Sequence, residues 1–212
     1  TFQSYIPSSL SFPINIYSTI EIIREAKESR IHPAELLEVK AEGLSRILTR
    51  NKECILKDTL TYCLREIFRN VIEHSNAGQF GFCAQYLPSL NRVYLAIIDR
   101  GIGLAAALSN NPTLQIEDDQ DAILKALSPG ISGKVFPGQK RKPKGEWANS
   151  GYGLFMTSNI CKRGGGFFIA SGNAGYYTSE NKERFIETPF KGTALNLSID
   201  TSRSPSPQKK SF

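Results

Sequence analysis

The 212-residue sequence has no long apolar run, no secretory signal and no closely paired cysteines. Its apolar runs stay well short of the roughly 20 residues that a helix needs to span a bilayer, which argues against membrane association. The four cysteines are widely spaced and form no Cys-X-X-Cys pair, which argues against a disulfide framework. We therefore expect a cytoplasmic protein with reduced thiols.

Positive charge is in moderate excess, with 26 Lys and Arg against 20 Asp and Glu and a net charge of +6. Much of the excess lies in residues 134–144 and 202–212. Neither segment alternates aromatic side chains with base-reading residues, so we expect no direct binding of nucleic acid. A local phosphate partner explains the basic residues more simply. The Ser, Pro and Lys content of residues 201–212 predicts a disordered tail.

Capping residues and hydrophobic periodicity predict an α+β protein. In residues 1–50 we expect an extended segment and two helices, the first capped by Ser18 with Glu21 and the second begun by Pro33. We interpret this part as an N-terminal helical extension for interaction or dimerisation, followed by one domain over residues 51–200. The helices predicted in that domain cover 53–75, 118–128 and 149–163, and the strands cover 79–87, 92–98, 166–172, 184–187 and 193–199.

The helix predicted over residues 53–75 carries a polar stripe beside its apolar face. At about 100° per residue, Glu66, Asn70 and Glu73 cluster on one flank. Such a flank could face a binding site. The alternative is a solvated edge, on which Arg69 pairs with Glu66 at i+3 or with Glu73 at i+4.

Two glycine motifs stand at predicted element boundaries. In DRGIG, Asp99 ends a strand, where its carboxylate can accept a hydrogen bond from an exocyclic amine such as that of adenine. Gly101 and Gly103 allow the backbone to approach a ligand closely. The second motif, SGYGL at 150–154, precedes a helix whose N–H groups and dipole can bind phosphate. The alternatives are an ordinary turn and an ordinary helix start.

The order of these motifs is more specific than any one of them. A helix with E-X-X-X-N precedes a strand ending in D-X-G-X-G, a long basic segment, G-X-G-L before a helix, and G-T at a final strand. Over about residues 50–200 this order resembles the Bergerat ATP-binding fold of the GHKL superfamily, which includes gyrase-type topoisomerases, histidine kinases and anti-sigma serine kinases. The resemblance implies a two-layer α+β sandwich. Its sheet would be mixed but mostly antiparallel, with helices on one face and an ATP lid at about 104–150.

The resemblance also implies roles for individual residues. Asn70 matches the ligand of a magnesium ion on the ATP phosphates, Glu66 matches the residue that activates the attacking water, and Asp99 matches the acid that reads adenine. ATP and Mg²⁺ are therefore the expected cofactors. The other expected nucleotide contacts are His74, Gly101, Gly103, Ser132, Gly133, Lys134, Gly151, Tyr152, Gly153, Leu154 and Thr193.

Three functions are consistent with such a site. The first is ATP hydrolysis with Glu66 as base, coupled to regulation of a partner protein. The second is transfer of the γ-phosphoryl group to a protein, and the third is an interaction module that nucleotide gates with little turnover. The only histidines are His32 and His74, and His32 lacks a histidine-kinase dimerisation motif around it, so we expect any phosphoacceptor on another chain. The sequence does not decide whether the chain forms a homodimer through residues 1–50.

Overall fold

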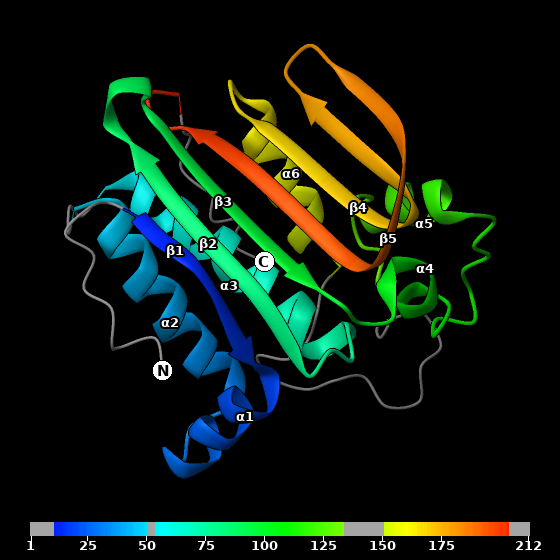
Figure 1. Cartoon of the computed structure of the whole chain (residues 1–212), viewed down its shortest axis with the longest axis horizontal. Helices are drawn as coiled ribbons and strands as arrows, with labels where there is room; N and C mark the ends of the chain where they lie inside the picture. Colours follow the sequence, from blue (N-terminus) through cyan, green and yellow to red (C-terminus); the bar gives the residue numbers. More distant parts are fainter. Residues whose placement is uncertain (1–10, 51–53, 134–150, 204–212) are drawn as a thin grey trace.

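The computed structural model describes residues 11–50, 54–133 and 151–203 of the chain. This part forms five strands and six α-helices (Figure 1). None of these helices is long and apolar enough to cross a bilayer. A short 3-10 turn at Pro88–Leu90 joins the second and third strands. The strands are β1 (Ser11–Ser18), β2 (Gln79–Leu87), β3 (Arg92–Asp99), β4 (Gly166–Ser179) and β5 (Glu183–Asp200). The helices are α1 (Thr19–Glu28), α2 (Pro33–Leu48), α3 (Ile55–His74), α4 (Gly103–Leu108), α5 (Asp119–Ala126) and α6 (Gly153–Lys162).

The strands form one sheet in the order β1-β2-β3-β5-β4, and each pair of neighbours is antiparallel. The expectation of a mixed sheet is therefore wrong for the described ranges. Short connections join β2 to β3 and β4 to β5, and strands joined in this way run antiparallel. Because β5 lies between β4 and β3 and runs opposite to both, no parallel pair arises in this part of the chain.

The first two helices begin where their capping residues predict. At the start of α1, the Ser18 hydroxyl accepts the N–H of Glu21 at 3.2 Å. At the start of α2, Nδ1 of His32 accepts the N–H of Ala34 at 3.3 Å, and Pro33 occupies the first helical position. Both predicted helix starts are confirmed.

Helices α2, α3 and α6 cover one face of the sheet, which gives the molecule two layers (Figure 1). Side chains alternate between the faces, as in β3, where Val93 and Leu95 are buried while Tyr94 between them is exposed. On the covered face, the ring of Phe68 in α3 packs edge-on against that of Phe82 in β2, with centroids 5.3 Å apart. The predicted two-layer α+β arrangement is thus confirmed.

Residues 11–50 belong to the same core as the rest of the molecule. β1 pairs with β2 at the edge of the sheet, and α2 packs along α3. Leu37 and Leu48 of α2 are fully buried in the cluster that contains the inner side chains of the sheet. The boundary expected near residue 50 therefore does not separate two hydrophobic cores.

Two strands are longer than the sequence predicted. Residues 184–187 and 193–199 are parts of the continuous β5, and β4 runs to Ser179 instead of ending at residue 172. Pro189 lies beyond the residues of β5 that pair with β3, at an irregular point of the β4–β5 ladder. A missing N–H is tolerated there, which is why the proline does not end the strand.

The described part of the expected lid, residues 104–133, has regular structure. Helix α4 packs on α5, and α5 packs on β4. Leu108, Ala122 and Ala126 form a small apolar cluster between the two helices. Residues 134–150, which complete the expected lid, lie outside the described residues.

Candidate functional site

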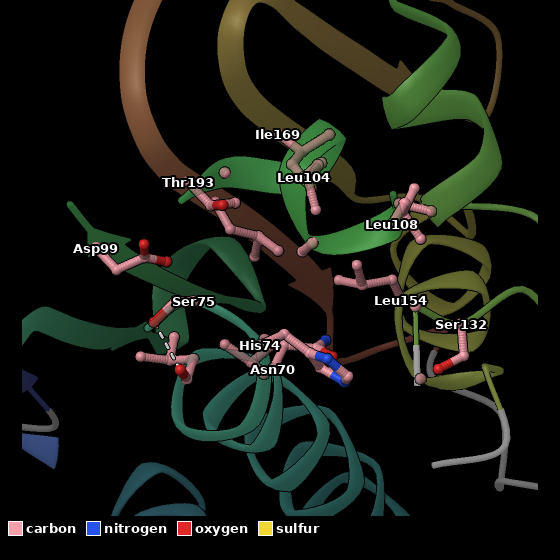
Figure 2. Close-up of a pocket in the computed structure, with 18 of the residues that line it drawn as sticks. Asn70, His74, Ser75, Asp99, Leu104, Leu108, Ser132, Leu154, Ile169 and Thr193 are labelled. Atoms are coloured by element: carbon pink, nitrogen blue, oxygen red, sulfur yellow. Dashed lines mark hydrogen bonds between the residues drawn. The ribbon is translucent and has the colours of Figure 1, made fainter. Parts of the chain in front are cut away.

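A pocket lies among the C-terminal part of α3, the end of β3, α4, the start of α6 and β5 (Figure 2). Its cavity volume is about 90 Å³, below the roughly 300 Å³ at which pockets enclose most of a small ligand. The described residues therefore enclose a space that could hold only one part of a drug-sized ligand. Among the sequence-predicted residues, Glu66, Gly101 and Tyr152 do not line the pocket. Those that do are Asn70, His74, Asp99, Gly103, Ser132, Gly133, Gly151, Gly153, Leu154 and Thr193.

Asp99 supplies a buried carboxylate to this pocket. It ends β3 with 4% of its surface exposed. Its Oδ1 accepts the N–H of Gly101 at 2.8 Å, and the strand register pairs Asp99 with Thr193 of β5. Burial raises the pKa of the Asp99 carboxyl, and hydrogen bonds from the backbone of Gly101 and Thr193 offset part of this rise. The pocket thus holds a desolvated acid that can accept a further hydrogen bond from a ligand.

Two glycines near Asp99, Gly101 on the same chain segment and Gly192 on β5, allow close contacts between backbone segments. A Cβ atom on Gly101 would lie 1.9 Å from the carbonyl oxygen of Ser75, at the end of α3. The N–H of Ile102 donates to the same oxygen at 2.8 Å. Gly192 has a φ of +104°, and a Cβ there would lie 2.1 Å from the carbonyl oxygen of Asp99. Gly101 therefore shapes the pocket without lining it, by holding α3 against the end of β3.

Helix α3 presents Asn70 and His74 to the pocket (Figure 2). Nδ2 of Asn70 is buried and has no hydrogen-bond partner in the described ranges. Since buried polar atoms are nearly always paired, this amide is suited to contact a ligand. His74 lies on the next turn, and its Nε2 is 3.9 Å from Oε2 of Glu73.

The start of α6 contributes Gly151, Gly153 and Leu154 to the pocket. Gly151 adopts a φ of +70°, and its carbonyl accepts the N–H of Gly130 at 3.1 Å. Tyr152 at the N-cap position gives the helix no side-chain hydrogen bond. The first-turn N–H groups of α6, together with the helix dipole, favour a negatively charged group at this end.

Ser132 and Gly133 line the pocket beside α4. The side chain of Asn111 donates Nδ2 to the carbonyl oxygen of Ser132 at 2.8 Å. Gly133 lies so close to α4 that a Cβ would be 2.1 Å from the carbonyl oxygen of Ala107. Lys134 follows immediately but lies outside the described residues, so its contact with nucleotide stays a prediction.

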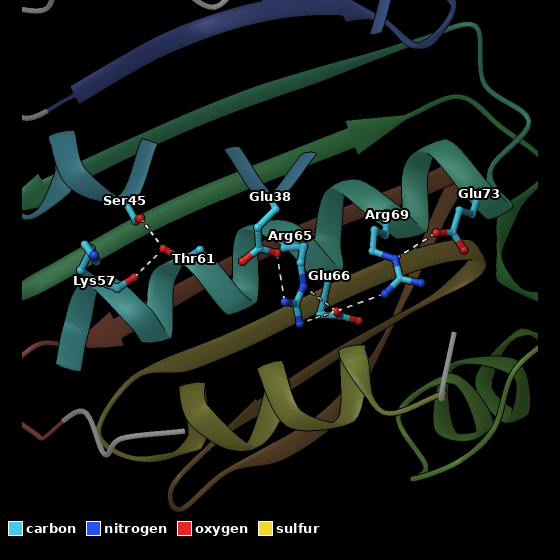
Figure 3. A network of polar contacts seen from close by, with 8 residues as sticks. All are labelled: Glu38, Ser45, Lys57, Thr61, Arg65, Glu66, Arg69 and Glu73. Atoms are coloured by element: carbon cyan, nitrogen blue, oxygen red, sulfur yellow. Dashed lines mark hydrogen bonds and ion pairs between the residues drawn. The ribbon is translucent and has the colours of Figure 1, made fainter. Parts of the chain in front are cut away.

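Glu66 is buried and is not among the residues that line the pocket. It belongs to a network of polar contacts along α3 (Figure 3). Its Oε1 accepts a hydrogen bond from Nε of Arg65 at 3.1 Å and lies 3.6 Å from Nη1 of Arg69. Arg69 also donates from Nε to Oε1 of Glu73 at 2.9 Å. The pairing of Arg69 with Glu66 and Glu73 that the helical spacing predicts is therefore confirmed, while Asn70 on the same flank faces the pocket.

Ser171 and helix α4 were not among the predicted features of the site. Ser171 Oγ accepts the N–H of Leu104 at 2.9 Å and donates to the carbonyl oxygen of Gly192 at 2.8 Å. It thereby ties the start of α4 to β5. Leu104 and Leu108 of α4 line the pocket, and the apolar run GLAAAL directly after DRGIG was the available signal for this short helix.

The side chains at the pocket could bind a metal ion only if a bound ligand supplied further oxygen atoms. Within the ranges that the structure describes, no three His, Cys, Asp or Glu side chains are grouped to hold a metal. Mg²⁺ commonly takes one or two protein oxygens and completes its shell with water and substrate phosphates. The unpartnered Nδ2 of Asn70 is a hydrogen-bond donor that suits a phosphate oxygen, and Oδ1 of the same amide would be the magnesium ligand, with the phosphates supplying the negative charge.

No protein-family model and no curated protein matches this chain.

Proposed function

We propose that the pocket binds ATP with Mg²⁺ and that the bound nucleotide regulates a partner protein. The observation that carries this proposal is convergence: Asn70, Asp99 and the glycines of α6 are far apart in the sequence, yet line one pocket. A buried acid and a helix start without a side-chain cap lie at this pocket. Within the two-layer α+β architecture, the family we propose is the Bergerat fold of the GHKL superfamily.

The enclosed part of the pocket suits a planar base. The exocyclic amine of adenine would donate to Asp99, whose buried carboxylate has acceptor capacity beyond its bond to Gly101. Leu104 and Leu154 would pack on the base, because both side chains line the pocket. Guanine presents a carbonyl oxygen where adenine has its amine, so Asp99 would repel it.

The phosphates would extend from the enclosed part toward α6. The N–H groups around Gly151 and Gly153 would contact them, as helix starts do in other phosphate sites. Asn70 would hold the magnesium ion on the phosphates. That ion neutralises phosphate charge and orients the chain of phosphates when it is bound.

The position of Glu66 favours a nucleotide-gated regulatory module over rapid hydrolysis. Its carboxylate is paired with Arg65 and Arg69 and does not line the pocket. Hydrolysis by Glu66 is the second candidate function, favoured by its location one helical turn before Asn70. Transfer of the γ-phosphoryl group would require an acceptor on a partner chain.

Two measurements test the proposal. Calorimetric titration with ATP and GTP, each with and without Mg²⁺, should give Mg²⁺-dependent binding of ATP in the micromolar range and much weaker binding of GTP. Equal affinity for the two nucleotides would refute the assignment of Asp99. Incubation with γ-labelled ATP, alone and with candidate partners, then distinguishes phosphate release, protein labelling and simple binding.

A further inference from the structure

Glu66 is held through one of its two carboxylate oxygens (Figure 3). Nε and Nη2 of Arg65 are each 3.1 Å from Oε1 of Glu66, and Nη1 of Arg69 is 3.6 Å from the same atom. The side chains of Glu66 and Arg69 are each 10% exposed, so water competes little for these contacts. Two guanidinium groups on one buried oxygen fix the direction of the carboxylate.

The second oxygen, Oε2, lies against the first residue of α6. A Cβ atom on Gly153 would be 2.4 Å from Oε2 of Glu66, so this oxygen lies close to the backbone of Gly153. Gly153 lines the pocket, whereas Glu66 does not. Glu66 therefore lies behind Gly153, beside the pocket, whereas a general base must reach the attacking water.

The two arginines are anchored in different directions. Nη1 of Arg65 donates to Oε2 of Glu38 on α2 at 3.0 Å, and Nε of Arg69 donates to Oε1 of Glu73 on α3 at 2.9 Å. Nη2 of Arg69 is buried and has no hydrogen-bond partner in the described part of the chain. Because an unpaired buried donor is costly, Arg69 would be stabilised by an additional anionic oxygen within its reach.

We propose that Arg65 and Arg69 are positioning residues that hold Glu66 out of the pocket and thereby keep bound ATP from being hydrolysed. This inference rests on the proposed ATP site. An anionic group that draws Arg69 away, such as a carboxylate of the partner protein, releases Glu66 toward the pocket on the flank it shares with Asn70.

The released carboxylate of Glu66 then takes a proton from a water molecule. As it does so, the water oxygen forms a bond to the γ-phosphorus of ATP. The bond from that phosphorus to the bridging oxygen breaks, and ADP leaves with the bonding electron pair.

The test compares ATP affinity and phosphate release in three variants. Arg69→Gln should release phosphate roughly tenfold faster or more, a part of the hundredfold or greater contribution of a general base. Its dissociation constant for ATP should change little, because Arg69 does not line the pocket. Arg69→Lys keeps the positive charge and should restore the slow rate. The double variant Glu66→Gln/Arg69→Gln should lose the gain because it lacks the base.

Arg46→Gln is the matched control. Arg46 forms an i−4 ion pair with Glu42 at 2.8 Å on α2 and does not line the pocket, so this variant should release phosphate at the wild-type rate. Thermal melts report whether each variant folds. Arg65→Gln serves as the second variant, since the Arg65 side chain is 31% exposed and its loss leaves less buried space unfilled.

Two results would overturn the inference. One is a folded Arg69→Gln or Arg65→Gln variant that binds ATP but releases phosphate no faster than wild type. The other is a gain in Arg69→Gln that persists in the double variant, since the base would then not be Glu66. A wild-type chain that binds no ATP overturns the proposed function itself, and the binding titration identifies that outcome separately.

Discussion

Asp99→Asn should weaken ATP binding without weakening the fold. In the native chain, Oδ1 of Asp99 accepts the N–H of Gly101 at 2.8 Å, and an asparagine can keep this bond through its own Oδ1. Its Nδ2 then replaces the second carboxylate oxygen. The substituted residue would present a donor to the amine of adenine, which is itself a donor.

The size of the effect on binding follows from the bond that is lost. A hydrogen bond to a charged group contributes about 1.5–3 kcal/mol, which corresponds to a roughly ten- to hundredfold increase in the dissociation constant. GTP should be affected in the opposite direction, because the amide of asparagine can donate to the carbonyl oxygen of guanine. The ratio of the two affinities should therefore narrow, a change that partial unfolding cannot produce.

Although Asp99→Asn should weaken ATP binding, it should not lower the stability of the fold at neutral pH. Burial raises the pKa of Asp99 above its ordinary value of 3.8, so folding favours the protonated carboxyl. The corresponding stabilisation is present below the unfolded pKa and is lost as pH rises through the folded pKa. At pH 7 the ionised Asp99 costs stability that an uncharged asparagine does not, so Asp99→Asn should melt at the same temperature as wild type or above it.

Calorimetric titration and thermal melts, each performed on the same preparations, measure both effects. Asp58→Asn is the matched control, because it makes the same change of charge at an exposed position of α3 away from the pocket. Wild-type affinity for ATP in Asp99→Asn would refute the assignment of Asp99 as the adenine acceptor. An equal loss of ATP affinity in Asp58→Asn would show that the loss in Asp99→Asn comes from the change in net charge.

Three further outcomes are expected. Asn70→Ala should weaken ATP binding in the presence of Mg²⁺ and change it little without the ion, as titrations under the two conditions would measure. Gly101→Ala should lower the melting temperature, because its Cβ would lie 1.9 Å from the carbonyl oxygen of Ser75; an unchanged melt would contradict this. Burial raises the pKa of Cys63 to about 12, so maleimide should label exposed Cys54 but not Cys63 in the native protein, as read by mass spectrometry.

Capping residues predicted the beginnings of the first two helices. Ser18 and Pro33 marked the starts of α1 and α2, because capping depends on residues close in the sequence. Helix α4 was missed since six residues are too few for a helical period to stand out. The extent of β5 could not be predicted from Pro189 and Gly192, because their effect depends on which neighbouring strand pairs with each part of β5.

The predicted residues that line the pocket stand near the ends of helices and strands. Asn70, Asp99 and Gly153 line the pocket, and their motifs stand at the ends of α3, β3 and the start of α6. The contacts of Arg65 and Arg69 with Glu66 were predicted only in part. Arg69 lies three residues away on the same helix, whereas the contribution of Arg65 depends on Glu38 of α2, and the packing of α2 on α3 cannot be deduced from spacing within either helix.

The pairing of β3 with β5 determines when the site can form during synthesis of the chain. This ladder pairs residues 92–99 with residues 193–200, so Asp99 and its partner Thr193 are far apart in the sequence. Translation releases the N-terminal part first, and Asp99 therefore leaves the ribosome well before Gly192, whose backbone packs on its carbonyl oxygen. A nascent chain would carry Asn70 and Asp99 for much of its synthesis without a pocket around them. The nucleotide binding that we propose would thus begin only when translation of residues 51–200 is nearly complete.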